Sequence, residues 1–193
     1  MYKGDFSQGK WHGKGIKYYE SGKKMYEGDF SENKYHGKGI KYYDNGNNTK
    51  QYEGDFSENE WDGKGIEYYE SGKKMYEGEW KNDKKHGEGI DYYIHFENNT
   101  KLYEGYFSQG KWDGKGIEYY HNGKKWYECE WKNDKKHGEG IKYYFSGKKL
   151  YEGEWKNDKK HGEGIEYSSN ENNTKLYEGD FSQDKWHGKG CLL

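Results

Sequence analysis

One short unit repeated eight times makes up this sequence, and that periodicity constrains the fold more than any other feature. A tyrosine opens each unit, at Tyr2, Tyr26, Tyr52, Tyr76, Tyr103, Tyr127, Tyr151 and Tyr177. Consecutive opening tyrosines are separated by 24 to 27 residues. Self-similarity at such a period is typical of arrays in which each unit is one supersecondary structure stacked on its neighbours. The sequence therefore predicts one continuous array over residues 1–193, whose eighth unit is incomplete.

Within each unit the residue pattern predicts a β-hairpin. In the second unit, two short alternating runs at 26–30 and 36–43 are separated by polar residues. Alternation places Tyr26, Gly28 and Phe30 on one face of the first strand. Glycines recur inside these strands beside bulky rings, so we expect a ring from a neighbouring strand to lie across each glycine. Such packing would bury apolar area in a sheet that is poor in leucine.

Turn-forming dipeptides separate the expected strands. Asn45-Gly46 and Asn122-Gly123 have the composition of tight turns. The other expected turn carries His-Gly or Asp-Gly, at His12, His36, Asp62, His86, Asp113, His137, His161 and His187. Histidine and aspartate share a tolerance of positive φ but no simple catalytic role, so we interpret these dipeptides as turns. Three longer units carry their additional residues in the link between hairpins, at 47–49, 98–100 and 172–174.

Composition excludes several classes of function. Hydrophobic residues make up 29% of the chain and charged residues 35%, but 20% are aromatic, which argues against disorder. The net charge of −2, with acids and lysines interleaved, gives no basic patch of the kind that nucleic-acid binding requires. Cys129 and Cys191 form no redox or metal-ligand spacing. Unpaired thiols, with neither a signal peptide nor a long apolar run, predict a cytoplasmic protein, located at the membrane periphery or on the cytoskeleton.

Residues 76–89 and 151–164 carry the family resemblance. Each segment reads Tyr-Glu-Gly-Glu-Trp-Lys-Asn followed by His-Gly-Glu-Gly, which resembles the consensus of the membrane-occupation-and-recognition-nexus (MORN) repeat. The resemblance covers essentially the whole chain and implies an all-β fold. The implied fold is an elongated, single-layer antiparallel sheet of tandem β-hairpins, twisted or solenoid-like. MORN repeats occur beside lipid kinase and lysine methyltransferase domains and as free-standing cytoskeletal scaffolds, so an accessory N-terminal part of a lipid-kinase-like protein is one implied role.

Catalytic chemistry finds no support in the residues. Corresponding histidines in successive hairpins would lie roughly 9.6 Å apart, too far to share a zinc ion. The repeated Gly-Lys-Gly lies in an expected strand and lacks the helix that a phosphate-binding loop requires. We therefore expect no enzymatic activity, no cofactor and no metal site.

Two binding hypotheses remain. The first is a protein-interaction scaffold that uses the aromatic residue just before the His-Gly or Asp-Gly dipeptide. The residues expected to contact a partner are Trp11, Tyr35, Trp61, Trp112 and Trp186. Open strand edges at the ends of a sheet can also pair with another chain, which adds the hypothesis of self-association.

The second hypothesis is peripheral attachment to anionic phospholipids or phosphoinositides. Its candidate contacts are three lysine clusters, made up of Lys81, Lys84, Lys85, Lys132, Lys135, Lys136, Lys156, Lys159 and Lys160. Each lysine near an anionic surface contributes ~1 kcal/mol. The interleaved acids Asp83, Asp134 and Asp158 would weaken that attraction. Both hypotheses describe a binding module.

Overall fold

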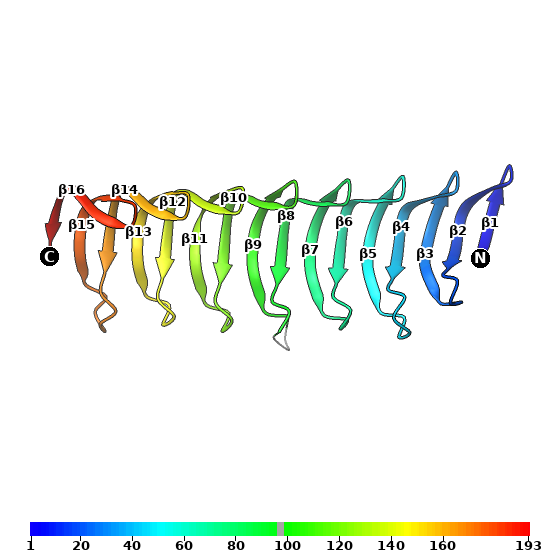
Figure 1. The fold of residues 1–193 in the computed structure, drawn as a ribbon, viewed down its shortest axis with the longest axis horizontal. Helices are drawn as coiled ribbons and strands as arrows, with labels where there is room; N and C mark the ends of the chain where they lie inside the picture. The colour runs from blue at the N-terminus through cyan, green and yellow to red at the C-terminus, as the bar shows by residue number, and fades with distance from the viewer. Residues whose placement is uncertain (96–98) are drawn as a thin grey trace. The chain divides into compact units, whose positions relative to one another are not determined.

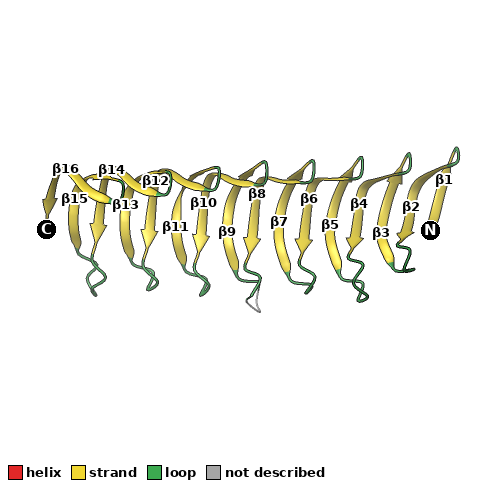
Figure 2. Ribbon diagram, in the orientation of Figure 1, coloured by secondary structure: helices red, strands yellow, loops and turns green. Residues whose placement is uncertain are grey.

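The computed structural model describes residues 1–95 and 99–193, which form two compact units, Met1–Asn99 and Thr100–Leu193 (Figures 1 and 2). Unit 1 contains the strands β1 (Tyr2–Ser7), β2 (Lys10–Tyr18), β3 (Lys24–Ser31), β4 (Lys34–Tyr42), β5 (Lys50–Ser57), β6 (Glu60–Tyr68), β7 (Lys74–Lys81) and β8 (Lys84–Tyr92). Unit 2 contains β9 (Lys101–Ser108), β10 (Lys111–Tyr119), β11 (Lys125–Lys132), β12 (Lys135–Tyr143), β13 (Lys149–Lys156), β14 (Lys159–Tyr167), β15 (Lys175–Ser182) and β16 (Lys185–Leu192).

Each unit is an open antiparallel sheet. In unit 1 every strand pairs with the next strand along the chain. Unit 2 follows the same rule. These tandem hairpins confirm the expected all-β fold. No helix in the described residues has the length and apolar character needed to cross a membrane.

The glycines inside the strands leave space on the sheet in which the rings of the opening tyrosines pack. In the hairpin β3–β4, Gly28 lies opposite Gly39, and the ring of Tyr26 lies across both. A Cβ atom on Gly39 would meet the Tyr26 Oη at 2.2 Å. Tyr26 is fully buried, and its hydroxyl donates a hydrogen bond to the carbonyl oxygen of Asp29 at 2.9 Å. The expected packing of rings over glycines is confirmed.

Aromatic side chains form a layer on one face of each unit, which we call the ring row. Around Tyr26, the ring of Tyr35 stacks at 3.9 Å, and Phe30 and Phe56 approach edge-on at 5.0 and 5.1 Å. Phe56 belongs to the next hairpin, so each hairpin completes the core of the one before it. In unit 1 the ring row consists of Tyr2, Phe6, Trp11, Tyr26, Phe30, Tyr35, Tyr52, Phe56, Trp61, Tyr76 and Trp80. In unit 2 it consists of Tyr103, Phe107, Trp112, Tyr127, Trp131, Tyr151, Trp155, Tyr177, Phe181 and Trp186.

The position predicted for the second turn is wrong. The His-Gly and Asp-Gly dipeptides at 12, 36, 62, 86, 113, 137, 161 and 187 lie inside the even-numbered strands. The turns are instead the dipeptides Gln8-Gly9, Glu32-Asn33, Glu58-Asn59, Asn82-Asp83, Gln109-Gly110, Asn133-Asp134, Asn157-Asp158 and Gln183-Asp184, in which both residues have positive φ. Two-residue hairpin loops of this conformation match the twist of the flanking strands.

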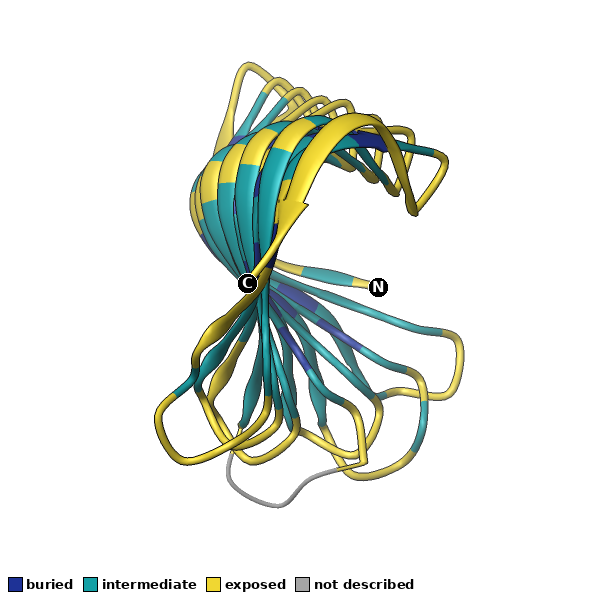
Figure 3. Cartoon of the chain, turned by 90° about the vertical axis from the view of Figure 1, so that its left-hand side faces the viewer, coloured by how far each residue is buried: buried dark blue, intermediate teal, exposed yellow. Residues whose placement is uncertain are grey.

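A bulge explains why His-Gly and Asp-Gly resemble turns. The glycine of each dipeptide has a φ between 56° and 108°, whereas the histidine or aspartate before it does not have positive φ. The register shifts at this point, for example between Gly28 and Asp29 opposite β4. Such bulges bend a strand, and the strands are visibly bent in Figure 3. Histidine and aspartate therefore replace one another at a strand position that directly precedes a glycine with positive φ.

Links between hairpins lie at the strand ends opposite the two-residue turns, and their residues are mostly exposed, like those of the turns (Figure 3). The standard link, such as residues 19–23, is stabilised by Tyr19, whose hydroxyl donates to the carbonyl oxygen of Tyr42 in the next hairpin at 2.6 Å. The insertions 47–49 and 172–174 lie in these links, as predicted. Of the third insertion, Asn98 lies outside the described residues, whereas Asn99 has a φ of 47°, close to that of Asn48 and Asn173.

Cys129 occupies the strand position that is glycine in the other seven repeats, and it disturbs the ring row. Its Cβ atom fills the space above Gly140. Seven of the eight opening tyrosines donate a hydrogen bond to the carbonyl oxygen three residues later, and Tyr127 is the exception within the described residues. Instead, the Tyr127 ring lies against Trp126, with centroids 5.1 Å apart. A side chain at this position thus displaces the tyrosine.

Candidate functional site

The sheet face opposite the ring row carries open grooves, and we call it the groove face. Its floor consists of the strand glycines and of isoleucines such as Ile40 and Ile66 in unit 1. Its rims carry the glutamate after each opening tyrosine and the residue between the two glycines of Gly-x-Gly. In unit 1, one groove has a volume of about 670 Å³, and another of about 450 Å³ adjoins it at Glu27. Unit 2 has two adjoining grooves of about 600 and 570 Å³, which share Glu139 and Glu152.

Charges on the groove face of unit 1 are mostly compensated. Lys14 Nζ lies 2.6 Å from Asp29 Oδ1, and Lys38 Nζ lies 2.7 Å from Asp55 Oδ1. Each pair links two hairpins, because the lysine and the aspartate are opposite one another in adjacent strands. Glu27 receives a hydrogen bond from Lys24 at 2.7 Å, which lowers the pKa of its carboxyl group. This groove is therefore polar but close to neutral.

In unit 2, Lys115 lies opposite Glu130, but the next two junctions between hairpins bring like charges together at the same positions. Glu139 lies opposite Glu154, and Glu163 lies opposite Asp180. Among the described residues, none of these four carboxylates forms an ion pair. Like charges directly opposite each other in a sheet are destabilising. The grooves of unit 2 therefore combine an apolar floor with acidic rims.

On the ring-row face, burial perturbs two titratable groups of unit 2 that lie beside the rings. Glu118 is opposite Tyr127, and Lys142 is opposite both Tyr127 and Tyr151. Removal from water raises the pKa of Glu118 from 4.5 to about 7, an effect that Lys136 partly offsets. Burial lowers the pKa of Lys142, and nearby Lys160 adds to this effect. Both groups are less stable in their charged forms than in water.

The raised pKa of Glu118 predicts a pH-dependent stability that Glu118→Gln removes. The folded-state pKa of about 7 exceeds the ordinary value of 4.5, so folding takes up a proton between these values. The associated stability is fully present below pH ~4.5 and is lost as the pH rises through ~7. We expect Glu118→Gln to stabilise the chain near pH 8 by on the order of 1–3 kcal/mol and to change little near pH 5. Thermal unfolding followed by circular dichroism at both pH values measures this. Equal effects at both values would contradict it, and Glu20→Gln, at an exposed position, is the control.

The aromatic residues predicted to contact a partner lie in the ring row. Trp11, Trp61 and Trp112 stack on opening tyrosines with centroid separations of 4.7, 4.3 and 4.2 Å. Tyr35 is 9% exposed, whereas Trp186 in β16 is 49% exposed. Packing thus accounts for the first four rings, and Trp186 is the one that offers a large free surface. Partner binding by these rings stays a prediction.

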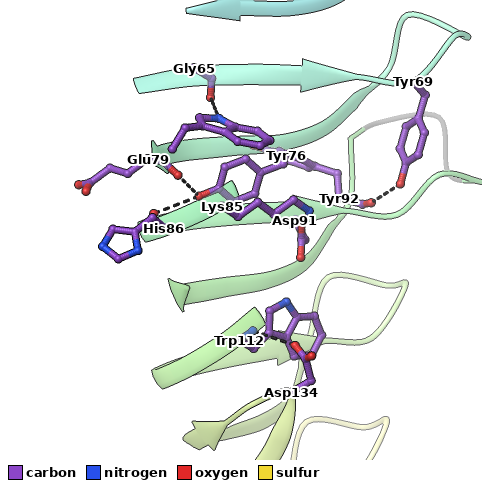
Figure 4. Close-up of polar contacts among 11 residues, drawn as sticks. Gly65, Tyr69, Tyr76, Glu79, Lys85, His86, Asp91, Tyr92, Trp112 and Asp134 are labelled. Atoms are coloured by element: carbon purple, nitrogen blue, oxygen red, sulfur yellow. Dashed lines mark hydrogen bonds and ion pairs between the residues drawn. The ribbon is translucent and has the colours of Figure 1, made fainter. Parts of the chain in front are cut away.

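Three of the predicted lipid-contacting lysines occupy the ring-row position that is aromatic in the other repeats. Lys85 Nζ lies 4.8 Å from the centroid of Tyr76, Lys136 Nζ 4.4 Å from that of Tyr127, and Lys160 Nζ 4.9 Å from that of Tyr151. Cation–π contact therefore replaces ring stacking in these units. Figure 4 shows Lys85 beside Tyr76, whose hydroxyl donates to the carbonyl oxygen of Glu79 at 2.9 Å.

The acid partners of these lysines further fix their ammonium groups. Lys85 pairs with Asp91 within its own hairpin. Lys136 Nζ is 3.1 Å from Asp158 Oδ1, and Lys160 Nζ is 2.7 Å from Glu166 Oε1. A lysine held this way is less available to a membrane than an exposed one.

The other six predicted lysines lie exposed beside the two-residue turns. In register, Lys81 faces Lys84, Lys132 faces Lys135, and Lys156 faces Lys159, and we call these three pairs the turn lysines. The interleaved aspartates contact the preceding hairpin. For example, the backbone N–H of Trp112 donates to Asp134 Oδ1 at 2.8 Å (Figure 4), and that of Lys136 donates to Asp158 Oδ1 at 2.9 Å.

Sequence reasoning missed the groove face as a candidate site. The signal was present in the residue between the two glycines of Gly-x-Gly, which is lysine at 14, 38, 64, 115 and 189 but glutamate at 88, 139 and 163. Its significance depends on the residue opposite in the next hairpin, such as Asp29 for Lys14 and Glu154 for Glu139. That pairing follows from the register.

Comparison with known proteins agrees with this architecture. A model of the MORN repeat matches eight segments, residues 2–24, 26–48, 52–74, 76–90, 103–125, 127–149, 151–172 and 177–193. No curated protein matches the chain. MORN repeats are a module generally linked to membrane and protein interactions. With eight matches spread over residues 2–193, the chain belongs to the MORN repeat family.

Proposed function

We propose that this chain is a non-catalytic scaffold that binds a protein partner in the grooves of its sheet. One observation carries the proposal: a groove of unit 2 is lined by the half-buried Ile117 and Ile141 and by Glu139, which lies opposite Glu154 and, like it, has no ion-pair partner in the described residues. Exposed apolar floors with a charged rim are typical of recognition surfaces. The chemistry fits an extended segment that alternates apolar and basic side chains.

Charge and spacing support such a partner. Glu139 and Glu154, and likewise Glu163 and Asp180, raise the local negative potential, so a basic segment would relieve repulsion between like charges. Isoleucines recur once per hairpin along the same face, at Ile117, Ile141 and Ile165. An extended segment that crosses the strands would meet isoleucines of successive hairpins roughly 9.6 Å apart.

Peptide binding tests this proposal. An octapeptide that alternates valine and lysine should bind more tightly than its valine–glutamate counterpart, with an affinity that falls as salt increases. Charge reversal at Glu139 and Glu163, both to lysine, should weaken binding of the basic peptide at least tenfold. Fluorescence anisotropy of labelled peptide measures both effects. The matched control reverses Lys132 and Lys156, which lie beside the turns. Indifference to peptide charge, or equal loss in the control, would refute the proposal.

A second candidate function, peripheral binding to anionic phospholipids, is favoured by the turn lysines. Their side chains are exposed in facing pairs, while Asp134 and Asp158 accept hydrogen bonds from the preceding hairpin. Co-sedimentation with phosphatidylserine vesicles at low and physiological salt tests this function. Binding that fades with salt, and that is lost on charge reversal at Lys84, Lys135 and Lys159, supports it. The control reverses Lys64, Lys115 and Lys189 on the groove face, which alters the net charge equally. Binding that is absent at both salts, or lost equally in the control, would exclude this function.

A further inference from the structure

In unit 1, β2 receives β3 through a set of contacts whose ion pair and ring packing recur between β4 and β5. Between β2 and β3, Lys14 lies opposite Asp29 and forms an ion pair with it at 2.6 Å. The ring of Phe30 then packs against the preceding hairpin, with its centroid 5.0 Å from Tyr2 and 5.8 Å from Trp11. This contact leaves Phe30 only 2% exposed. A hairpin therefore offers a lysine and a stacked ring pair, and its neighbour supplies an aspartate and a phenylalanine.

The strand β16 offers the first half of this set along its outer edge. Tyr177 and Trp186 are stacked, with centroids 4.7 Å apart and an interplanar angle of 9°. Every residue of β16 is exposed, including Lys189, which corresponds to Lys14. Among the described residues, β16 pairs with β15 alone. The Tyr177–Trp186 pair is thus a receiving surface of the same kind that Tyr2 and Trp11 present to Phe30.

The strand β1 offers the complementary half. Phe6, which corresponds to Phe30, is 62% exposed, and its ring contacts that of Tyr2 edge-on at 5.3 Å. Asp5 corresponds to Asp29 and is also exposed. In the part of the chain that the structure describes, β1 pairs with β2 alone. Its outer edge therefore carries a phenylalanine, an aspartate and unpaired backbone groups.

We infer that β1 of one molecule pairs with β16 of a second copy of this chain, in the register that joins hairpins within a unit. In that register Lys189 faces Asp5, Gly190 faces Gly4, and Phe6 closes on the stacked rings of Tyr177 and Trp186. The backbone of β1 then completes the antiparallel ladder of β16. This inference concerns the strand edges and does not depend on what the grooves bind.

Three observations favour a second copy over an unrelated partner. The charges are complementary, since Lys189 and Asp5 repeat the pair Lys14–Asp29. The glycines of both strands also repeat an internal junction, since Gly190 would face Gly4 as Gly15 faces Gly28 between β2 and β3. The ring sizes also match, because Phe6 is the residue type found at Phe30 and Phe56. Such head-to-tail contacts join different surfaces, so they propagate into chains of molecules unless they close into a ring.

Molar mass in solution tests the inference. For residues 1–193, light scattering after size-exclusion chromatography should show a mass that rises with protein concentration. Asp5→Lys alone or Lys189→Asp alone places like charges at the junction and should weaken association at least tenfold. The double variant Asp5→Lys with Lys189→Asp restores the pair and should restore association. A monomer at every concentration, or no rescue in the double variant, would overturn the inference.

A cross-linking arm tests the register independently. Cys191 is exposed, and the proposed register places it opposite Lys3, as Ile16 is opposite Glu27. Under mild oxidation Lys3→Cys should form a disulfide with Cys191 of another molecule, yielding covalent multimers on a non-reducing gel. Lys10→Cys, which lies beyond the junction, should not. The buried Cys129 provides no competing thiol. Equal cross-linking of both variants would mean that the proposed register is wrong.

Discussion

Tyr52→Ala is expected to lower the free energy of unfolding by about 3–5 kcal/mol, the range found for large aromatic truncations in protein cores. Tyr52 is fully buried and lies in the middle of the ring row of unit 1. Its ring stacks on Trp61 at 4.3 Å and meets Phe56 and Trp80 edge-on at 5.1 and 5.6 Å. Removing it opens a cavity shared by two hairpins, because Trp80 belongs to β7.

Tyr52→Phe is the matched control for this prediction. It keeps the ring and removes only the hydrogen bond from the hydroxyl to the carbonyl oxygen of Asp55, which measures 3.1 Å. Its cost should be about 1 kcal/mol. Repeat arrays need not unfold in one step, so amide hydrogen exchange in β5 and β6 should accompany denaturant unfolding. Equal destabilisation by both variants would show that the ring contributes little.

Gly65→Ala is expected to destabilise the chain by about 3 kcal/mol, at the upper end for overpacking, although it adds a single methyl group. A Cβ atom on Gly65 would lie 2.1 Å from Oη and 2.3 Å from Cζ of Tyr52. The tyrosine cannot retreat without losing its stack on Trp61. Cys129 illustrates the result, because it corresponds to Gly54, the glycine opposite Gly65, and its side chain accompanies the displacement of Tyr127. Denaturant unfolding measures the loss.

Two comparisons make this prediction specific. Gly72→Ala adds the same methyl group in a link, where the nearest atom is Thr49 Cγ2 at 3.9 Å and the φ is 81°. Only the left-handed backbone penalty of about 1–2 kcal/mol is expected there. In a Tyr52→Ala background, Gly65→Ala should cost little, because the clashing ring is absent. Additive losses in the double variant would contradict the proposed packing.

The opening tyrosine is covered by an aromatic ring in some repeats and by a lysine in others. In one repeat, Trp61 stacks on Tyr52. At the corresponding position of another repeat, Lys160 in β14 lies over Tyr151, and Trp155 lies in the neighbouring strand β13. The lysine thus covers the tyrosine face with its aliphatic chain and its charge. The exchange of an aromatic residue for lysine puts lysines close to the turns. Because Glu139 and Glu163 line a groove of unit 2, the basic turns are separate from the acidic grooves. That separation underlies both proposed binding modes.

The sequence by itself determined the hairpin array. Rings and glycines alternate with the period of a strand, and strand geometry alone then decides which side chains share a face, as with Tyr26, Gly28 and Phe30. The repeat of 24 to 27 residues placed each opening tyrosine, and the insertions marked the links. These features are local, so they can be predicted without knowing which strand lies beside which residue.

Only the tertiary structure decided where the chain reverses and which residues meet across hairpins. His36-Gly37 has the composition of a turn, yet the turn is Glu32-Asn33, because a bulge also requires a glycine with positive φ. The opposition of Glu139 to Glu154 likewise depends on register. A shift of register by one residue would exchange the two faces of a strand, and a local pattern does not specify the pairing partner. For that reason the extent of the ring row, the half-buried lysines and the charged grooves emerged only from the assembled sheet.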